Sequence, residues 1–328
     1  MKVLVTGGAG FIGSHLVDRL VDDGHEVVVL DNFLNGNKID SGTIEKIDLI
    51  EGDVRNEETV HQVTKGCELV YHLAAYLGVD IVADNPVETM ETEALGTRNV
   101  GNACIASGVE RLIYISTSGV YGKAAIEQAV DEDFLAAPNS SYAIAKRYNE
   151  IYLQALFQEK HLQSCSLRYF NVYGPRQDER MVIPRFFNQA LKGAPLSVYG
   201  TGQQTRDFTY IDEVIEATVL LAERFKGCEI VNIAKGEDAS IVEIANKIIA
   251  LTESDSEVAL INPPQGRYDF EVQRRCGNSD KLKRIAGFIP SLPLDEGLKK
   301  TFEFIKNSSP VAGQMERPSH MLESGHQR

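Results

Sequence analysis

A glycine-rich turn between a short apolar strand and a helix constrains the fold of this chain more than any other feature. The strand-like run Val3 to Thr6 leads into Gly7 to Gly13 (GGAGFIG), and residues 11–22 then have helical spacing. Because glycine has no Cβ, this turn can be tight, can bring bare backbone N–H groups to a pyrophosphate and can let the helix pack closely on its sheet. The turn therefore predicts a phosphate-binding site at the first strand of an α/β sheet.

Apolar runs of strand length alternate with segments of helical spacing through the first half of the chain. The predicted strands cover residues 3–6, 26–31, 48–51, 69–73, 112–116 and 164–169, and the predicted helices cover residues 11–22, 57–64, 86–106 and 142–159. Continuous apolar strands that alternate with helices are typical of a parallel sheet covered on both faces. We therefore predict an α/β fold, with a doubly wound Rossmann domain over residues 1–171.

The alternation loosens after Asn171, where prolines and a Gly-Thr-Gly turn interrupt it. Short strands and loop are predicted over residues 196–210, and helices over residues 212–224, 241–250 and 294–305. We predict a smaller mixed α/β substrate lobe over residues 172–306, at the carboxyl ends of the strands, with a chain that can cross between the lobes. Residues 307–328 lack periodicity and are predicted to be a disordered tail.

Composition and charge exclude several classes of partner. The net charge of −14 disfavours a nucleic-acid or anionic-membrane surface, because polyphosphate backbones require an excess of Lys and Arg. The five cysteines form no C-x-x-C pair, which indicates free thiols in a reducing compartment and no metal site. The chain opens directly into a strand and has no apolar run of membrane-spanning length, so we expect a cytoplasmic protein without a signal peptide.

The end of the second predicted strand selects the dinucleotide. A carboxylate there, Asp31, accepts hydrogen bonds from the adenosine ribose and repels a 2′-phosphate. The next residue is Asn32, and no Arg or Lys lies beside it to receive that phosphate, so NAD is favoured over NADP. His72, by contrast, is interpreted as a core histidine without a catalytic role. The residues assigned to NAD are Gly7, Gly10, Phe11, Ile12, Gly13, Asp31, Asn32, Asp53, Val54, Leu73, Ala74, Ala75, Asn99, Tyr142 and Lys146.

A tyrosine and a lysine at positions i and i+4 of a predicted helix form a candidate catalytic pair. Tyr142 and Lys146 lie on one helix face, and they follow a strand end rich in hydroxyl groups, Ser116 to Ser118. A tyrosine of ordinary pKa, about 10, is a poor base at neutral pH, but a lysine and a positively charged nicotinamide both favour the phenolate. Hydroxyls at a strand tip face the substrate crevice. The arrangement predicts proton transfer between a substrate alcohol and Tyr142.

Motifs spread from the first strand to about residue 306 form one recognisable set. They are Thr6 to Gly13, Asp31, His72 to Ala75, Ser116 to Gly122, Tyr142 with Lys146, Arg168 to Arg176 and Thr205 to Asp212. The set resembles the extended short-chain dehydrogenases/reductases and, more narrowly, the NAD-dependent nucleotide-sugar epimerase/dehydratase family. The resemblance implies NAD as cofactor, a UDP-sugar substrate, and homodimerisation through residues 86–106 and 142–159.

The same resemblance implies a role for individual residues. Thr117 occupies the catalytic Ser/Thr position, Tyr142 is the base and Lys146 assists it. Arginine suits the nucleotide diphosphate because its fork matches phosphate oxygens. The residues assigned to the substrate are Ser118, Asn171, Arg185, Val198, Tyr199, Arg206, Arg267 and Arg275.

Two positions depart from the family pattern. Glu93 stands where many relatives carry Asn before Gly96-Thr97, and Arg267-Tyr-Asp-Phe replaces the commoner Arg-Pro-Gly-Asp/Glu. Arg274 and Arg275 lie just downstream and are alternative ligands for the phosphates or for a uronate carboxylate.

The two residues after Thr117 distinguish between reactions of this family that all pass through a 4-keto sugar intermediate. Dehydratases of this family resemble Ser-Thr-Asp-Glu-Val-Tyr-Gly, and UDP-glucuronate decarboxylases resemble Ser-Thr-Ser-Glu-Val-Tyr-Gly. This chain has Ser118 and Gly119 there, and neither can act as a carboxylic acid or carboxylate base. We therefore predict a 4-epimerase.

Other readings of the sequence stay open. A UDP-glucuronate decarboxylase or another 4-keto-forming dehydratase is the alternative that Gln273-Arg274-Arg275 favours, and an NAD-binding protein without chemistry is a third. UDP-glucose, UDP-N-acetylhexosamine and UDP-glucuronate all fit as substrates, as do GDP- and dTDP-sugars.

Overall fold

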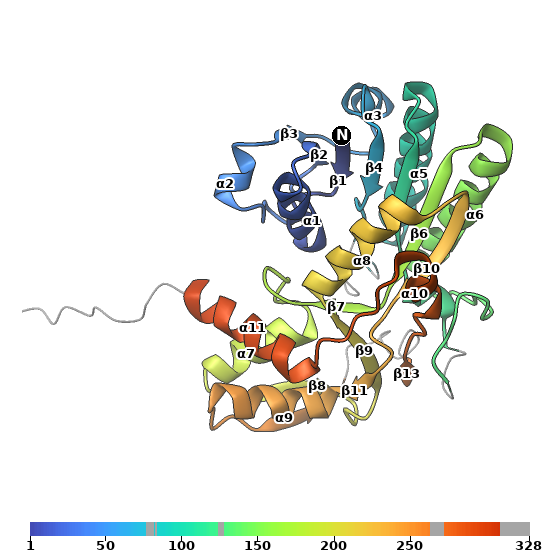
Figure 1. Cartoon of the computed structure of the whole chain (residues 1–328). Helices are drawn as coiled ribbons and strands as arrows, with labels where there is room; N and C mark the ends of the chain where they lie inside the picture. The colour runs from blue at the N-terminus through green and yellow to red at the C-terminus, as the bar shows by residue number, and fades with distance from the viewer. Residues whose placement is uncertain (77–81, 83, 124–127, 263–271, 309–328) are drawn as a thin grey trace, which may run out of the picture.

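A parallel sheet forms the centre of the larger lobe (Figure 1). The computed structural model describes residues 1–76, 82, 84–123, 128–262 and 272–308. Within these residues, seven parallel strands pair in the order β10-β6-β5-β4-β1-β2-β3. They are β1 (Lys2–Thr6), β2 (Glu26–Asp31), β3 (Asp48–Glu51), β4 (Leu69–His72), β5 (Arg111–Thr117), β6 (Gln163–Tyr169) and β10 (Cys228–Ile233). The predicted Rossmann sheet is confirmed.

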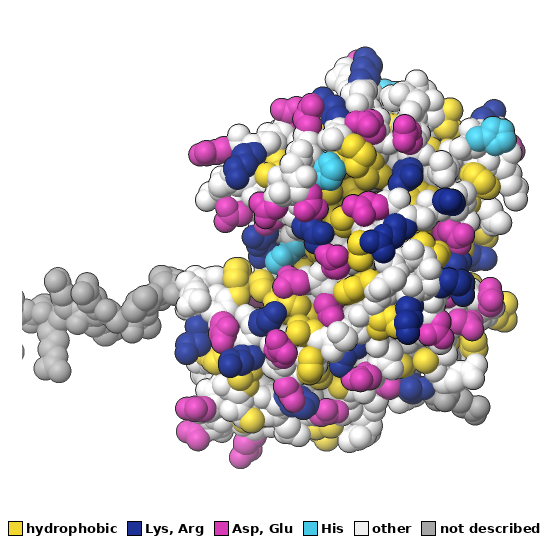
Figure 2. Space-filling view, viewed as in Figure 1, with side chains coloured by type: hydrophobic (Ala, Val, Ile, Leu, Met, Phe, Trp, Pro, Cys, Tyr) yellow, Lys and Arg dark blue, Asp and Glu magenta, His cyan; other side chains and the backbone are white. Residues whose placement is uncertain are grey.

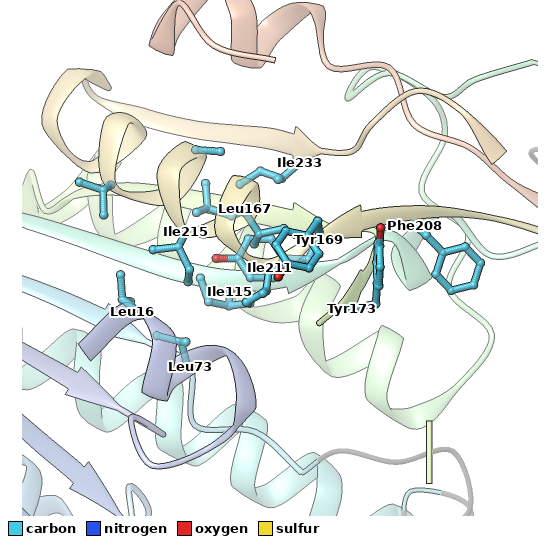
Figure 3. Close-up of a cluster of buried hydrophobic side chains, with 14 of the residues drawn as sticks. Leu16, Leu73, Ile115, Leu167, Tyr169, Tyr173, Phe208, Ile211, Ile215 and Ile233 are labelled. Carbon is cyan, nitrogen blue, oxygen red and sulfur yellow. The ribbon is translucent and has the colours of Figure 1, made fainter. Parts of the chain in front are cut away.

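Two separate cores cover the two faces of the sheet, and alternate side chains of strands such as β1 enter one or the other. In β1, Val3 and Val5 belong to the core under α1 (Phe11–Asp22) and α8 (Ile211–Arg224), and Figure 3 shows part of it. Leu4 belongs to the core on the other face. That core contains side chains of α3 (Glu57–Thr64), α5 (Pro86–Ser107) and α6 (Ser141–Lys160). Burial on both faces explains why these strands are continuously apolar.

The smaller lobe is built from short strands and helices that follow β6. Its main sheet contains β7 (Asn171–Tyr173), β9 (Thr205–Tyr210), β11 (Asp238–Ser240) and β13 (Arg274–Arg275). A parallel pair, β8 (Leu196–Tyr199) with β12 (Val258–Ile261), forms a separate two-stranded sheet. The helices of this lobe are α7 (Val182–Leu191), α9 (Ile241–Thr252) and α11 (Leu294–Ser308). Helix α10 (Asp280–Ala286) packs instead against α8 and β10 of the larger lobe, which also contains the short α2 (Ser41–Ile44) and the 3-10 turn η1 (Ser118–Tyr121).

The structure differs from the sequence prediction in several elements, among them β10, α7 and α11. Strand β10 returns from beyond residue 171 to the first sheet, so the chain crosses between the lobes. Helix α7 was not predicted because Pro184 was read as an interruption, but a proline in the first helical turn removes no helical hydrogen bond. Helix α11 runs to Ser308, two residues into the predicted tail, and residues 309–328 lie outside the described residues.

Two surface properties bear on possible partners. Among the described residues, no helix combines the length and the apolar character that a membrane span requires. On the face shown in Figure 2, basic and acidic side chains are interspersed, and neither sign forms a continuous area.

Candidate active site

A cavity of about 1110 Å³ opens at the carboxyl ends of the central strands. The strand order reverses at β1: β2 and β3 follow on one side of it, and the chain then crosses to β4 on the other side. Ligands bind at such a switch point in open α/β sheets. The cavity brings together most of the residues predicted for the cofactor and the chemistry. These are Gly7, Gly10, Phe11, Ile12, Gly13, Asp31, Asn32, Asp53, Val54, Leu73, Ala74, Ala75, Thr117, Tyr142, Lys146, Asn171 and Arg275.

The glycine turn offers the backbone that a pyrophosphate requires. Gly7 has φ 71°, and a Cβ there would meet the backbone N of Ala74 at 2.6 Å, so the turn needs glycine. Helix α1 begins after Gly10 with no side-chain cap and no acidic residue in its first turn. Its first N–H groups therefore have no competing carboxylate, and the turn fits the negatively charged diphosphate of NAD.

Asp31 lies at the adenosine end of the cavity with its carboxylate already oriented. Its Oδ2 accepts a hydrogen bond from the Ala9 N–H at 2.9 Å, and its Oδ1 accepts one from the Phe33 N–H at 2.8 Å. Burial raises the pKa of this carboxyl, while the two backbone donors oppose that shift. Each carboxylate oxygen keeps a further lone pair, so the group can still accept the ribose hydroxyls.

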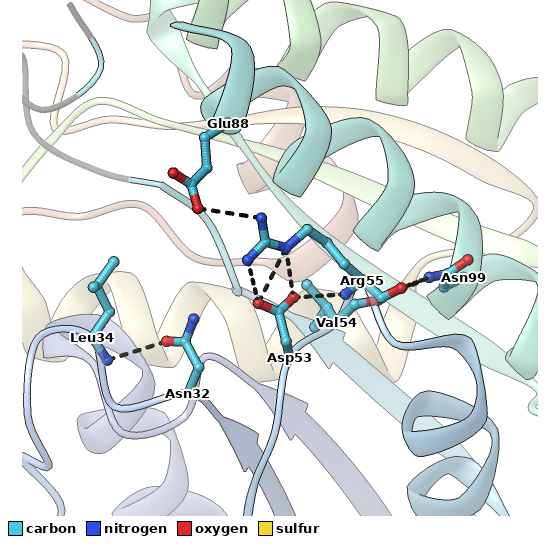
Figure 4. A network of polar contacts seen from close by, with 7 residues as sticks. All are labelled: Asn32, Leu34, Asp53, Val54, Arg55, Glu88 and Asn99. Atoms are coloured by element: carbon cyan, nitrogen blue, oxygen red, sulfur yellow. Dashed lines mark hydrogen bonds and ion pairs between the residues drawn. The ribbon is translucent and has the colours of Figure 1, made fainter. Parts of the chain in front are cut away.

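A polar network near Asp31 holds the loop that follows β3 (Figure 4). Arg55 chelates Asp53, with Nε–Oδ1 at 3.0 Å and Nη2–Oδ2 at 2.6 Å, and its Nη1 reaches Glu88 at 3.3 Å. This guanidinium lowers the pKa of Asp53. Asn99 does not line the cavity as predicted for a cofactor ligand; its Nδ2 donates to the carbonyls of Val54 and Arg55 at 3.1 and 3.0 Å. Asn99 therefore supports the loop from behind.

The catalytic candidates come from the end of β5 and the start of α6. Thr117 lines the cavity, and its Oγ1 accepts a hydrogen bond from the Gly119 N–H at 3.0 Å, which fixes its orientation. Helix α6 is capped by Ser140, whose Oγ accepts from the Ala143 N–H at 3.2 Å. This cap places Tyr142 in the first turn, where it lines the same cavity.

Lys146 is one turn further along α6 and is almost fully enclosed, with 1% of its surface exposed. Its Nζ donates to the carbonyl of Ile115 at 2.8 Å and lies 3.0 Å from Oε2 of Glu93, which is fully buried. The sequence predicted that Lys146 favours the phenolate of Tyr142. Burial and the Glu93 charge raise the pKa of Tyr142 well above 10, and nothing in the sequence indicated this charge beside Lys146.

His72 is a structural residue, as predicted. Its Nδ1 lies 2.7 Å from Oγ1 of Thr6 and its Nε2 lies 3.1 Å from Oγ1 of Thr97. Burial, together with the nearby charge of Lys146, lowers the pKa of His72 from 6.5 to about 3. The imidazole is therefore neutral throughout the physiological range.

The depressed pKa of His72 predicts a loss of stability in acid. Below pH 6.5 the unfolded chain binds a proton at this residue, and the folded protein does not until about pH 3. The free energy of unfolding should therefore fall as pH falls, by up to about 1.4 kcal/mol per pH unit from this group. Urea unfolding of His72→Gln should show a shallower slope over the same range; an unchanged slope would contradict the assignment.

The substrate side of the cavity contains one of the two candidate arginines. Arg275 lines the cavity and its Nη2 lies 3.5 Å from the carbonyl of Gly122. Arg274 is instead chelated by Asp238, with both N–O distances 3.0 Å. Successive residues of a strand point to opposite faces, so β13 presents only Arg275 to the cavity.

Several residues predicted for the substrate lie away from this cavity. Ser118 is buried in η1. Arg185 of α7 stacks 5.0 Å from the ring centroid of Tyr199 in β8, next to the buried Val198. The Nη1 of Arg206 bonds the carbonyl of Thr205 at 2.7 Å. None of these five residues is part of the cavity lining, and Arg267 lies outside the described residues. Their substrate roles stay predictions.

Sequence reasoning missed a segment that closes one end of the cavity. Residues 177, 178 and 180–183 line it, and within them Asp178 and Arg180 pair through Oδ1–Nε at 2.6 Å. Nη2 of Arg180 also donates to Asn35 at 2.9 Å, which joins the smaller lobe to the loop after β2. The signal for this segment was the Arg176-Gln-Asp-Glu-Arg180 run, whose charges were not assigned. Among the described residues no group of three or more His, Cys, Asp or Glu side chains is arranged to hold a metal.

Comparisons with known proteins agree with this geometry. Residues 3–234 match the model of the NAD dependent epimerase/dehydratase family. The chain is 37% identical over 316 residues to the UDP-N-acetyl-alpha-D-glucosaminuronate decarboxylase of Bacillus cytotoxicus, with 93% of this chain and 98% of the relative covered.

Solved structures of epimerases share the fold. The UDP-glucose 4-epimerase of Thermotoga maritima with UDP-glucose has a TM-score of 0.88 and 33% identity, covering 94% of this chain and 99% of that one. The UDP-glucuronic acid 4-epimerase of Bacillus cereus, in complex with UDP-glucuronic acid and NAD, has a TM-score of 0.85 and 32% identity, with the same coverage. The glycine turn, Asp31, Tyr142 and Lys146 all line the cavity of this fold. The chain belongs to the NAD dependent epimerase/dehydratase family, and NAD is its cofactor.

Proposed function

We propose that this protein is a 4-epimerase of a UDP-sugar. The proposal rests on one observation: among the described residues, the strand end and the helix that carry the catalytic candidates bring no carboxylate into the cavity, where a dehydratase needs one. Of the described residues, those of β5, η1 and the start of α6 that line the cavity include no Asp or Glu. A dehydratase needs an acid to expel the C6 hydroxyl and a base at C5, whereas an epimerase needs neither. Gly119 instead leaves room beside Thr117 for a keto-sugar to turn.

Each catalytic candidate has a defined task in this reaction. NAD supplies the acceptor and donor for the hydrogen at C4 of the sugar. Thr117 hydrogen-bonds the C4 hydroxyl, and Tyr142 removes its proton and later returns one. Two of the three N–H groups of the Lys146 ammonium are used by Ile115 and Glu93. The third holds the nicotinamide ribose.

The substrate diphosphate and sugar are assigned to the cationic side of the cavity. Arg275 and Asn171 line it, and we assign the diphosphate to both. Arg185, Arg206 and Arg267, together with Val198 and Tyr199, are proposed to bind the nucleotide from the smaller lobe. UDP is preferred as the nucleotide because the relatives with solved structures bind UDP-sugars.

A UDP-uronate decarboxylase is the second candidate. Two observations favour it: Arg275 faces the cavity, where its guanidinium can also pair with a sugar carboxylate, and the Bacillus cytotoxicus relative is a decarboxylase.

Product analysis separates the two. Purified protein is incubated with UDP-glucose, UDP-N-acetylglucosamine and UDP-glucuronate in turn, and the products are analysed by NMR. The proposal predicts, from one of them, a product of unchanged mass with inverted configuration at C4. Loss of water or of carbon dioxide would instead establish a dehydratase or a decarboxylase.

Removing the Thr117 hydroxyl should slow the reaction without releasing the cofactor. Thr117→Val keeps the shape of the side chain but loses one hydrogen bond, worth about 1 kcal/mol or about five- to tenfold in turnover. NAD content should match that of the wild-type protein, because Thr117 is assigned only to the sugar. Thr201→Val, a change of the same kind on an exposed turn, should leave turnover unchanged. Unchanged turnover in Thr117→Val would refute the role.

We also propose a homodimer formed through α5 and α6. Large apolar side chains are exposed along both helices: on α6, Ile144, Tyr148 and Ile151 are 45%, 52% and 52% exposed at helical spacing, and on α5, Met90 and Leu95 are each 42% exposed. A second copy of the same pair of helices would cover this surface. Light scattering should give a dimer for the wild-type chain and for Leu191→Glu on α7, and a monomer for Ile151→Glu; a monomeric wild type would contradict the proposal.

A further inference from the structure

A buried ion pair stands directly behind the catalytic candidates. Glu93 of α5 has no exposed surface, and its Oε2 lies 3.0 Å from Nζ of Lys146. The backbone of Glu93 is held as well, because Nδ2 of Asn149 donates to its carbonyl at 3.0 Å. Burial raises the pKa of this carboxyl, and the Lys146 ammonium opposes that shift by stabilising its charged form.

Other ionisable groups around this pair do not supply a second compensating charge. From β4, His72 is neutral because burial lowers its pKa to about 3. From β5, Tyr114 lies with its hydroxyl 3.5 Å from Glu93, and burial raises its pKa well above 10, so it is also neutral.

The remaining nearby carboxylate on α6, Glu150, is already paired. Its two oxygens are chelated by Arg168 at 2.9 Å each, and Arg147 adds a contact at 2.8 Å. The charge of Lys146 is therefore offset by Glu93 and not by Glu150.

Offsetting Lys146 has a direct effect on Tyr142. The ammonium lies 5.5 Å from the centroid of the Tyr142 ring and on its own would stabilise the phenolate. Because the Glu93 carboxylate lies beside the ammonium, the two charges nearly cancel at the position of the Tyr142 phenol. A positive charge on the cofactor's nicotinamide ring is then the next charge able to favour ionisation.

We propose that Glu93 is a positioning residue that fixes the Lys146 ammonium and offsets its charge, so that Tyr142 ionises in response to the charge of the bound cofactor. This inference rests on the proposed role of Tyr142 as the base. Tyr142 is a phenolate, able to accept the substrate proton, when the nicotinamide is positively charged. It is a phenol, able to return the proton, when the ring is neutral. A glutamate at this position thus couples the direction of proton transfer to the oxidation state of the cofactor.

The test follows the ionisation of Tyr142 itself. Protein labelled with 13C at the ring carbon that bears the hydroxyl is titrated by NMR without cofactor, with NAD⁺ and with NADH, and the Tyr142 signal is assigned by its loss in Tyr142→Phe. Wild-type Tyr142 should titrate at lower pH with NAD⁺ than with NADH. In Glu93→Gln the titration should move to lower pH by about one unit or more in every state, because a negative charge close to the phenol is removed.

Matched variants separate this role from a purely structural one. Glu91→Gln removes the same charge from an exposed position of the same helix and should titrate as the wild type. Glu93→Asp keeps the charge and should also stay near the wild-type value. If Glu93→Gln is less stable but its Tyr142 titrates as in the wild type, Glu93 is only structural and the proposal is overturned.

A charge-balanced double variant covers the case in which Glu93→Gln does not fold. Glu93→Gln with Lys146→Met removes both charges, so Tyr142 should titrate close to the wild-type pH, whereas Lys146→Met alone should titrate higher. Equal titrations in Lys146→Met and the double variant would overturn the proposal. The titration needs no substrate, so its outcome is independent of the proposed epimerase activity, which fails only if no nucleotide sugar is converted.

Discussion

Replacing Tyr142 with phenylalanine should reduce turnover by about a thousandfold, within the range expected for loss of a general acid–base group. Tyr142 lines the same cavity as Thr117, and the described lining residues of β5 and α6 offer no carboxylate to replace its hydroxyl. The ring itself is retained in Tyr142→Phe, so the fold and the NAD content should be unchanged. Single-turnover formation of reduced cofactor, followed by absorbance, measures the effect directly.

The neighbouring Tyr152 provides a matched control for this experiment. It lies on the same helix outside the cavity, so Tyr152→Phe should retain wild-type turnover. If Tyr142→Phe also remains active, the base lies elsewhere. If the wild-type protein binds NAD but reduces none of it with any nucleotide sugar, the chain is an NAD-binding member of the family without chemistry.

Changing Asp31 to asparagine should weaken NAD⁺ binding by about ten- to a hundredfold. The carboxylate both accepts the ribose hydroxyls and orders the glycine turn through the Ala9 N–H, and a hydrogen bond to a charged group contributes about 1.5–3 kcal/mol. Loss of the negative charge should also narrow the preference for NAD⁺ over NADP⁺, because the 2′-phosphate is no longer repelled. Titration calorimetry with both cofactors gives the two affinities.

An exposed aspartate near the end of α1, Asp22, serves as the control for charge alone. Asp22→Asn removes one negative charge from the same lobe and should bind NAD⁺ as the wild type does. Equal NAD⁺ affinity in Asp31→Asn and the wild type would show that Asp31 does not contact the ribose.

Local chemistry explains why much of the larger lobe was predictable. The glycine turn, the strand-end position of Asp31 and the i, i+4 spacing of Tyr142 and Lys146 each depend on a few consecutive residues. Each strand of the sheet predicted from the sequence lies at or within two residues of its observed bounds. The α7 helix was missed because a proline at its start was read without its position in the turn.

Contacts between segments that are far apart in the sequence explain the features that could not be predicted. Nothing near Glu93 in the sequence indicates that α5 and α6 bring it to Lys146, so the contribution of Glu93 to raising the pKa of Tyr142 was not predicted. The choice between Arg274 and Arg275 depends on Asp238, which lies on another strand of the smaller sheet. Asn99 has an amide suited to a ligand, but helix packing directs it to loop carbonyls.

The isotope content of the product formed in D₂O tests the proposed epimerase activity most directly. An epimerase returns to C4 the hydrogen that was removed from it, so that hydrogen never exchanges with solvent, and UDP-glucuronate or another UDP-sugar should give a C4 epimer of unchanged mass without deuterium. A decarboxylase must instead protonate a carbanion from solvent. A product that has lost carbon dioxide and gained deuterium on the sugar ring would contradict the account.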